Sequence, residues 1–199
     1  MWFDHIPRRT GGRQRGENML IPSTPIAEWM EDAVPNSLAN RSWCIVSTGS
    51  RCEKIVAGRL KASGIGFVLP MVEVERVYCG RPCTVEVPMF TGCLFAQATE
   101  REVVAACGAG PIRSVSVASD PSSLGWQLHN LELALQRGVP LESCARTSLR
   151  HRAEISRGTL QGLQGLVDSL ENPSQLVFQI DGFPQAFSTE IAGSQVVAM

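Results

Sequence analysis

Cys79 and Cys83 are the closest pair of potential metal ligands in the sequence. A structural zinc site needs a full tetrahedral set of Cys or His ligands, and His5, His129 and His151 lie far from this pair along the chain. The seven cysteines form an odd number and lack the dense spacing of a secreted disulfide scaffold. We therefore expect no metal site and no cofactor, and we expect reduced thiols that are buried or flank a hairpin.

The sequence also lacks the common motifs of nucleophilic catalysis and phosphate binding. It contains no Gly-x-Ser-x-Gly elbow, no His-x-x-Glu-His helix, and no Walker or Rossmann glycine loop. Gly158, Gly162 and Gly165 are closely spaced, but neither a Lys-Ser/Thr pair nor a helical pattern follows them. Three histidines and one tyrosine leave few candidates for general acid–base catalysis. We therefore expect a protein that is not an enzyme.

Composition is typical of a folded soluble protein, with 44% hydrophobic and 19% charged residues. A formal net charge of −1 argues against a protein that coats nucleic acid by bulk electrostatics. Arg8-Arg9 has the form of a twin-arginine export signal, but residues 11–15 interrupt the apolar region that such a signal needs. No stretch approaches the roughly 20 apolar residues of a membrane span. We expect a cytoplasmic monomer without membrane contact.

The first predicted elements are a strand and a helix that follow a flexible leader over residues 1–40. The apolar run 42–48 reads as a buried strand. Ser50 and Glu53 have the spacing of a capping box, which predicts a helix start there and favours a structural role for Glu53 over a catalytic one. Gly64 is placed to end that helix in the left-handed conformation.

The following residues predict a protruding hairpin and then further strands and helices. Val-rich segments over 66–77 and 82–88 are joined by a glycine turn. Strands are expected over 92–97 and 112–117, and a second capping box over 99–102 predicts a short helix. A helix opening at Asp120-Pro121 carries a stripe of core leucines, namely Leu124, Leu128, Leu131 and Leu135. This order predicts an α+β fold, with a mostly antiparallel sheet backed by helices.

The pattern of apolar residues and glycines changes after residue 138. Residues 139–152 lack a clear period and suit a linker. Short apolar segments over 176–180 and 187–191 then flank a glycine turn, and Gly158, Gly162 and Gly165 precede them. Short strands with glycines at the corners predict a small β-barrel. A barrel of this size encloses only a small apolar core, which is little for a domain that folds independently.

Several blocks of this chain, taken in order, resemble the NusG/RfaH family of transcription elongation and antitermination factors. The blocks are 43–46, 51–54, 59–60, 64–65, 67–70 and Pro88-Met89-Phe90-Thr91-Gly92-Cys93-Leu94-Phe95. The segment 53–70 is most similar to specialised paralogues of the RfaH and UpxY type, and residues 158–191 resemble a KOW barrel. The resemblance implies a leader over 1–40, a NusG N-terminal-like (NGN) domain over 41–138, a linker over 139–152 and an SH3-like KOW β-barrel over 153–199.

The resemblance implies a protein that binds the clamp helices of RNA polymerase through an exposed apolar face and suppresses pausing or termination. By motif position, the polymerase-binding residues are Ser47, Phe90, Thr91, Cys93 and Phe95. The alternative is that the two phenylalanines only pack the sheet. Ser47 and Cys93 stand where family members often carry aromatic rings, which lowers the expected affinity for the clamp.

The resemblance further implies contact with non-template DNA through a local basic surface. Its candidate residues are Arg51, Lys54, Arg59 and Lys61. Residues 41–100 hold seven Lys and Arg against five Glu side chains, so a merely solvated helix face is the open alternative.

The KOW-like segment, with Gly158, Gly162 and Gly165 as its motif, implies Rho or a small-subunit ribosomal protein as partner. Its turn glycines disfavour helix, so we expect a constitutive barrel. The alternative function is a KOW-type RNA- or ribosome-binding module whose N-terminal domain is only a scaffold.

Overall fold

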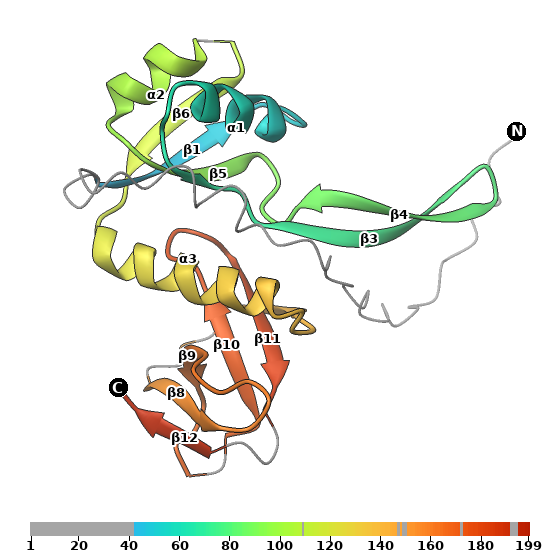
Figure 1. Cartoon of the computed structure of the whole chain (residues 1–199), viewed down its shortest axis with the longest axis vertical. Coiled ribbons are helices and arrows are strands. Elements are labelled where there is room, and N and C mark those ends of the chain that lie inside the picture. Colours follow the sequence, from blue (N-terminus) through green and yellow to red (C-terminus); the bar gives the residue numbers. More distant parts are fainter. Residues whose placement is uncertain (1–41, 109, 147, 149–150, 172, 192–194) are drawn as a thin grey trace, which may run out of the picture.

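The computed structural model describes residues 42–108, 110–146, 148, 151–171, 173–191 and 195–199. The leader predicted over residues 1–40 lies outside this part of the chain. The structure combines three helices with antiparallel sheets in an α+β fold over the described residues, which confirms the predicted fold class (Figure 1). None of the described helices is long and apolar enough to cross a membrane.

The N-terminal half is built on a four-stranded antiparallel sheet with the order β2-β5-β1-β6. Its strands are β1 (Trp43–Thr48), β2 (Phe67–Val68), β5 (Cys93–Gln97) and β6 (Ile112–Val117). Successive side chains of a strand point to opposite faces, and the buried side chains follow this alternation. Cys44 and Val46 belong to the core on one face, while Ile45 packs on the other. The sheet therefore separates two apolar clusters.

Two helices cover the first face, α1 (Glu53–Ala62) and α2 (Glu100–Cys107). Helix α1 ends as predicted, because Gly64 adopts φ +65° and its N–H donates to the Lys61 carbonyl at 3.0 Å. The Ile65 N–H donates to the Leu60 carbonyl, also at 3.0 Å, which completes a Schellman motif. Helix α2 begins at the Thr99 capping box that the sequence predicts.

Helix α3 (Pro121–Gln136) lies on the opposite face, between the N-terminal sheet and the C-terminal strands (Figure 1). The Asp120 carboxylate accepts the Ser123 N–H at 2.9 Å, and Pro121 takes the first helical position, where a missing N–H does no harm. The predicted leucine stripe is confirmed as core, since each of its members is at most 2% exposed: Leu124, Leu128, Leu131 and Leu135.

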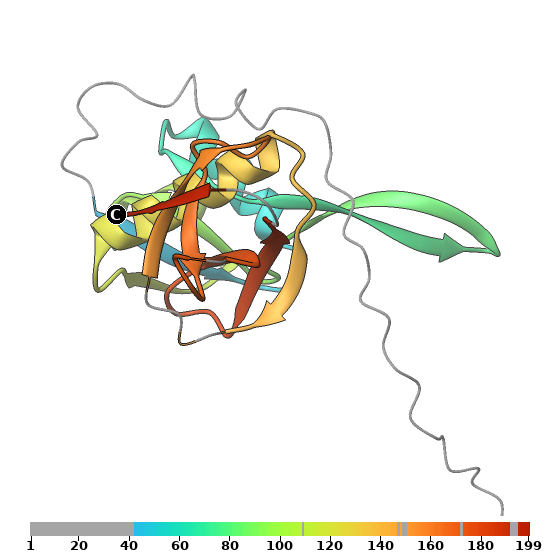
Figure 2. The same ribbon diagram turned by 90° about the horizontal axis from the view of Figure 1, so that it is seen from below.

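A two-stranded hairpin projects from the side of the molecule (Figures 1 and 2). It consists of β3 (Met71–Tyr78) and β4 (Arg81–Pro88), paired in unbroken register. Cys79 and Gly80 connect them with φ values of 49° and 75°, and two successive positive values are the signature of a type I′ turn. The predicted hairpin is confirmed.

The C-terminal half is a six-stranded antiparallel sheet with the order β12-β8-β9-β10-β11-β7. Its strands are β7 (Glu142–Ala145), β8 (His151–Arg157), β9 (Gln164–Val167), β10 (Gln175–Gln179), β11 (Gln185–Glu190) and β12 (Gln195–Ala198). Strand β7 falls inside the segment 139–152 that we predicted as a linker, and it pairs with β11 from Glu142 to Ala145. The segment thus contains a strand that its composition did not predict, because β-pairing with a distant strand overrides a local pattern with no clear period.

One apolar cluster runs through the molecule from the N-terminal sheet, across α3, to the C-terminal sheet. It contains Phe95 of β5, Leu128 of α3 and Phe187 of β11. The two halves therefore share a core in this conformation, with α3 as the middle layer. The division at 41–138 and 153–199 stays a prediction.

Candidate functional site

The candidate site is the sheet face that α1 and α2 leave uncovered. Strand alternation places Ser47 of β1 beside Cys93 and Phe95 of β5 on this face. In the sheet register, Ser47 lies opposite Cys93 and Ile45 opposite Phe95. The structure therefore brings together the residues that the motif positions single out, with the exposed Thr91 at the rim.

A buried carboxylate, that of Glu53, holds the loop that carries Phe90. Glu53 is 3% exposed, and its Oε1 accepts the N–H of Gly92 at 2.5 Å. The Gly92 carbonyl in turn accepts the Thr48 N–H at 2.8 Å, and Gly92 has φ +73°. This arrangement corrects the predicted capping box, because α1 has Cys52 at its N-cap and no side-chain cap hydrogen bond. Glu53 instead positions the Phe90 loop against α1.

Four phenylalanine rings meet on the candidate face. Phe90 and Phe95 lie 5.6 Å apart in an edge-to-face contact. The ring of Phe183 packs 4.9 Å from Phe90 and 5.5 Å from Phe95. Phe187 lies 5.8 Å from Phe90. Phe183 comes from the β10–β11 turn and Phe187 from β11, so the C-terminal sheet supplies half of this cluster.

The predicted face is consequently covered rather than exposed. Phe90 is 3% exposed and Phe95 is fully buried. The expectation of an open apolar patch is therefore wrong for this conformation. Its physical cause is the tip of the β10–β11 hairpin, whose Phe183 packs against both rings.

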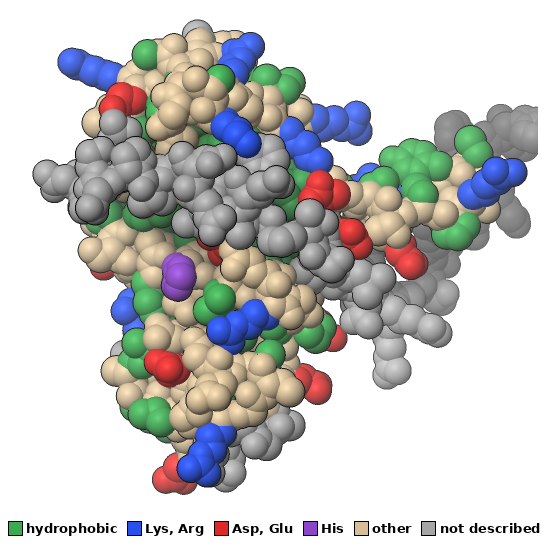
Figure 3. All heavy atoms as spheres, in the orientation of Figure 1, with side chains coloured by type: hydrophobic (Ala, Val, Ile, Leu, Met, Phe, Trp, Pro, Cys, Tyr) green, Lys and Arg blue, Asp and Glu red, His purple; other side chains and the backbone are tan. Residues whose placement is uncertain are grey.

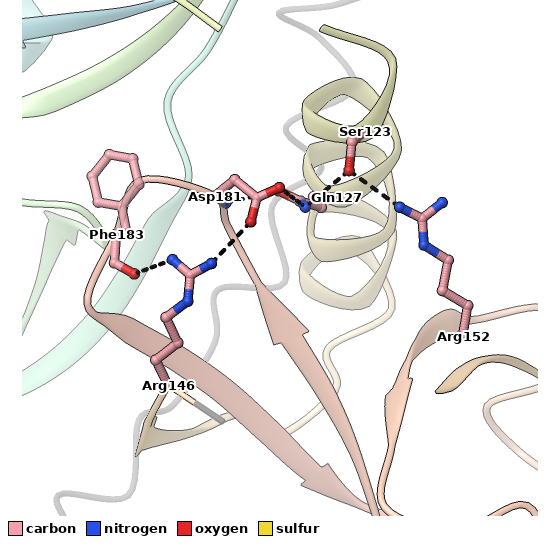
Figure 4. A network of polar contacts seen from close by, with 6 residues as sticks. All are labelled: Ser123, Gln127, Arg146, Arg152, Asp181 and Phe183. Atoms are coloured by element: carbon pink, nitrogen blue, oxygen red, sulfur yellow. Dashed lines mark hydrogen bonds and ion pairs between the residues drawn. The ribbon is translucent and has the colours of Figure 1, made fainter. Parts of the chain in front are cut away.

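Polar contacts around Asp181 hold that hairpin tip against α3 (Figure 4). The Asp181 N–H donates to the Gln127 side-chain oxygen at 2.8 Å, and the Asp181 carboxylate accepts the Gln127 amide at 2.8 Å. Arg146 contacts the other carboxylate oxygen at 3.1 Å and the Phe183 carbonyl at 3.3 Å. These groups are exposed to solvent, which limits the stability that each contact provides.

A second set of polar contacts joins α3 to β8 and β9. The Trp126 indole donates to the Gln164 side chain at 2.8 Å, and Asn130 accepts the Gln164 N–H at 3.2 Å. The Arg152 guanidinium lies 4.5 Å above the Trp126 ring and donates to Ser123 at 3.2 Å. Helix α3 is therefore attached to β8 and β9 as well as to the β10–β11 turn.

The predicted basic surface is only partly assembled. The Lys54 amine lies 3.5 Å from the Glu86 carboxylate of β4. Arg59 donates to the Cys107 carbonyl at the end of α2, on a different side of the helix from Lys54, because five residues correspond to about 140° of rotation. Lys61 shares the Lys54 side of α1, and Arg51 is exposed at φ 62° just before the helix.

The three glycines of the predicted KOW motif lie at the β8–β9 connection and in β9. Gly158 and Gly162 adopt φ values of 113° and 83°, which other residues rarely take. Gly165 lies in β9, where an added Cβ would come within 2.8 Å of the buried Leu176 side chain. All three therefore have backbone or packing reasons to be glycine.

The cysteines form no reactive or metal-binding group in the described part of the chain. All seven are free thiols, and no cluster of three or more potential metal ligands occurs there. Burial, with the Glu53 charge as a smaller cause, raises the pKa of Cys93 to about 12. Cys93 therefore acts as an apolar contact on the candidate face.

Sequence reasoning missed Phe183 and Phe187, which cover this face, and the Asp181–Gln127 contacts that hold the Phe183 turn against α3. One signal was available. A hairpin turn needs Gly182, but it does not need the large apolar ring of Phe183 beside it, and a phenylalanine in a turn is typical of a packing contact with another part of the molecule.

Comparison with known families gives a match, which spans the N-terminal sheet. Residues 41–117 match the family model described as "Transcription termination factor nusG". No curated protein matches the chain. The solved structure "Domain interaction in Thermotoga maritima NusG" is 14% identical, with a TM-score of 0.35, and the match covers 81% of this chain and 94% of that chain. The "MjSpt4:Spt5 complex conformation B" is 13% identical, with a TM-score of 0.25, and covers 79% of this chain and 97% of that chain.

Proposed function

We propose, from the match of residues 41–117 to the NusG family model, that the chain belongs to this family and is a non-enzymatic transcription elongation or antitermination factor. It binds the clamp helices of RNA polymerase through the face that carries Ser47, Phe90, Thr91, Cys93 and Phe95, and it suppresses pausing or termination. Within the family it belongs with the specialised RfaH- and UpxY-like paralogues, and it acts in the cytoplasm.

The observation that carries this proposal is the aromatic pair Phe90 and Phe95 on the same sheet face as Ser47 and Cys93. The buried residues of α1 and α2 belong to the cluster on the other face, and Phe183 and Phe187 of the C-terminal half pack against the Phe90 ring. Aromatic anchors in a desolvated pocket supply most of the affinity of typical protein interfaces. A helical partner that displaces Phe183 would gain the same ring contacts.

Because the face is covered, polymerase binding requires release of the β10–β11 hairpin. The cover consists of aromatic pairs worth about 0.5–1.5 kcal/mol each beyond their buried area. The exposed Arg146–Asp181 ion pair adds about 0–1 kcal/mol. The buried area of the rings adds about 1.5–3 kcal/mol for each fully buried ring, so a partner competes with this cover by burying a comparable apolar area on the same face. The released KOW-like sheet then recruits Rho or a small-subunit ribosomal protein, and the basic residues Arg51, Lys54, Arg59 and Lys61 face non-template DNA.

Retention of purified variants on immobilised core RNA polymerase tests this proposal. Phe183→Ala removes the covering ring, so we expect it to bind more tightly than the natural chain. Thr91→Glu places a charge on the exposed rim without altering the core, so we expect loss of binding. Val104→Ala on the far side of α2 is the matched control. Equal retention of the natural chain and the three variants would contradict the proposal.

The complete burial of Phe95 favours one alternative, in which the aromatic rings serve only the fold. The protein would then be a KOW-type RNA- or ribosome-binding module on a scaffold. Sedimentation with ribosomes distinguishes the two functions. The alternative predicts that Thr91→Glu leaves ribosome binding unchanged while no variant binds polymerase.

A further inference from the structure

The β3–β4 hairpin presents two chemically different faces. Strand alternation and the register Val72–Val87, Val74–Val85, Arg76–Cys83 and Tyr78–Arg81 place these eight side chains on one face. The other face carries Glu73, Glu75 and Val77, with Glu86, Thr84 and Pro82 opposite them. One face therefore holds two arginines, one tyrosine and no acid, while the other holds three glutamates and no base.

The base of the hairpin is fixed to the body of the protein. Val72 is buried, and Val74 and Val87 pack against the main apolar cluster. On the acidic face, Glu86 contacts Lys54 of α1. These contacts orient the hairpin, so its two faces hold fixed directions relative to the N-terminal sheet.

The distal end is exposed. Tyr78 is 58% exposed and Val77 is 72% exposed, and both arginines of the tyrosine face are exposed as well. Figure 3 shows basic side chains at the tip and acidic ones near the base. A type I′ turn needs only Cys79 and Gly80 in positive φ, so folding alone does not call for an exposed aromatic ring at this point.

The strand register makes two arginines neighbours of Tyr78 on the same face of the hairpin. Arg81 lies directly across the ladder, and Arg76 precedes Tyr78 by two positions on the same face of β3. Directly opposed residues in an antiparallel pair have Cβ atoms about 5 Å apart, and long side chains reach their diagonal neighbours too. A flat ring flanked by two cations matches a nucleotide, whose base stacks on the ring while its phosphates meet the guanidinium groups.

We propose that the Tyr78 face of the hairpin tip binds single-stranded nucleic acid. One base stacks on Tyr78, and the adjacent phosphates contact Arg76 and Arg81. The glutamates of the opposite face repel the backbone and so confine the strand to one side of the hairpin. Stacking and phosphate contacts read no base edges, so the contact is independent of sequence. This binding needs no polymerase and does not rest on the clamp-binding function.

The chain contains one tyrosine, so labelling tyrosine alone with stable isotopes gives a single ring reporter at the proposed contact. We would titrate the full-length labelled protein with a single-stranded oligonucleotide of about eight nucleotides at low salt. A stacked base shifts the Tyr78 ring resonances upfield. We expect a saturable upfield shift that weakens as salt is raised, because phosphate contacts release counterions.

Variants separate the roles of the ring and of the two cations. The double change Arg76→Gln and Arg81→Gln should weaken binding roughly tenfold and flatten its salt dependence. Tyr78→Leu should weaken binding about tenfold when binding is followed with an end-labelled oligonucleotide. Thr84→Ala on the opposite face is the matched control and should leave binding unchanged. Backbone amide spectra report whether each variant keeps the fold.

Two results would overturn the proposal. The first is a Tyr78 ring signal that does not move in the presence of a large excess of oligonucleotide. The second is an equal shift with an acidic peptide such as oligoglutamate, which would assign the tip to a protein partner instead.

Discussion

The ring of Phe183 lies 4.9 Å from the ring of Phe90, and this contact joins two segments that are far apart in the sequence. Phe90 belongs to the loop that Glu53 holds in place, and Phe183 belongs to a turn that Asp181 fastens to α3. The apolar surface that we propose as a docking surface is therefore occupied by a contact within the chain.

We predict measurable coupling between these two rings. In a double-mutant cycle with Phe90→Leu and Phe183→Leu, the free energy of unfolding should show a coupling of about 0.5–1.5 kcal/mol. Urea unfolding of the full chain measures this quantity. A cycle that pairs Phe90→Leu with Val104→Ala should show coupling below about 0.5 kcal/mol, because Val104 is an exposed residue of α2, which covers the other side of the sheet. Similar values for both cycles would contradict a direct ring contact.

Glu53 should matter for the Phe90 loop more than for the start of α1. Glu53→Ala leaves the Gly92 N–H without its buried acceptor, so it should lower the free energy of unfolding by about 1–3 kcal/mol. Urea denaturation measures the loss. Glu53→Gln keeps an acceptor oxygen and should cost less. The exposed Glu100→Gln, also in a first helical turn, is the control and should lie within about 0.5 kcal/mol of the natural chain.

Glu132 should make stability depend on pH. It is 4% exposed, its Oε1 has no hydrogen-bond partner within the described part of the chain, and burial raises its pKa from 4.5 to about 7. Between these values the unfolded chain releases a proton that the folded chain retains. The free energy of unfolding should therefore fall as pH rises from about 4.5 to 7, by at most about 3 kcal/mol, and then level off.

The Glu132→Gln variant isolates this effect. An amide does not titrate, so the stability difference between the variant and the natural chain should be small near pH 4.5 and should favour the variant above pH 7. Thermal unfolding across this pH range measures the difference. A difference that does not change with pH would show that Glu132 titrates normally in the folded protein.

Local chemistry was enough to predict most elements from the sequence. The Thr99 capping box, the Asp120-Pro121 helix start and the Gly80 turn each depend on a few neighbouring residues, and each is confirmed. The Ser50 capping box is wrong because Glu53 has a stronger competing partner, the N–H of Gly92, which lies far away in sequence. Single-sequence patterns do not contain that tertiary contact.

For the candidate site, too, the sequence predicted the features that depend on neighbouring residues and missed those that depend on distant ones. Motif positions placed Ser47, Cys93 and Phe95 correctly on one face, because strand alternation is local. The covering of that face by Phe183 depends on how the C-terminal sheet packs across α3, which no local pattern specifies. Strand β7 was missed for a related reason, since its pairing partner β11 lies about 40 residues further along the chain.

Two glycines should respond in opposite ways to the same substitution. Gly165 lies in β9, where an added Cβ would meet the Leu176 side chain at 2.8 Å and the Val177 carbonyl at 3.0 Å. Leu176 is fully buried and the Val177 carbonyl belongs to the paired backbone of β10, so Gly165→Ala should lower the free energy of unfolding by about 1–3 kcal/mol. Gly58 lies inside α1, with nothing within 4 Å of an added Cβ. Gly58→Ala should therefore raise the free energy of unfolding by about 0.5–1 kcal/mol, because alanine restricts the unfolded chain and favours helix. Parallel urea titrations of the two variants measure both effects. If Gly165→Ala were neutral, β9 and β10 would have to lie further apart than in this structure, and the close packing of the C-terminal sheet would be disproved.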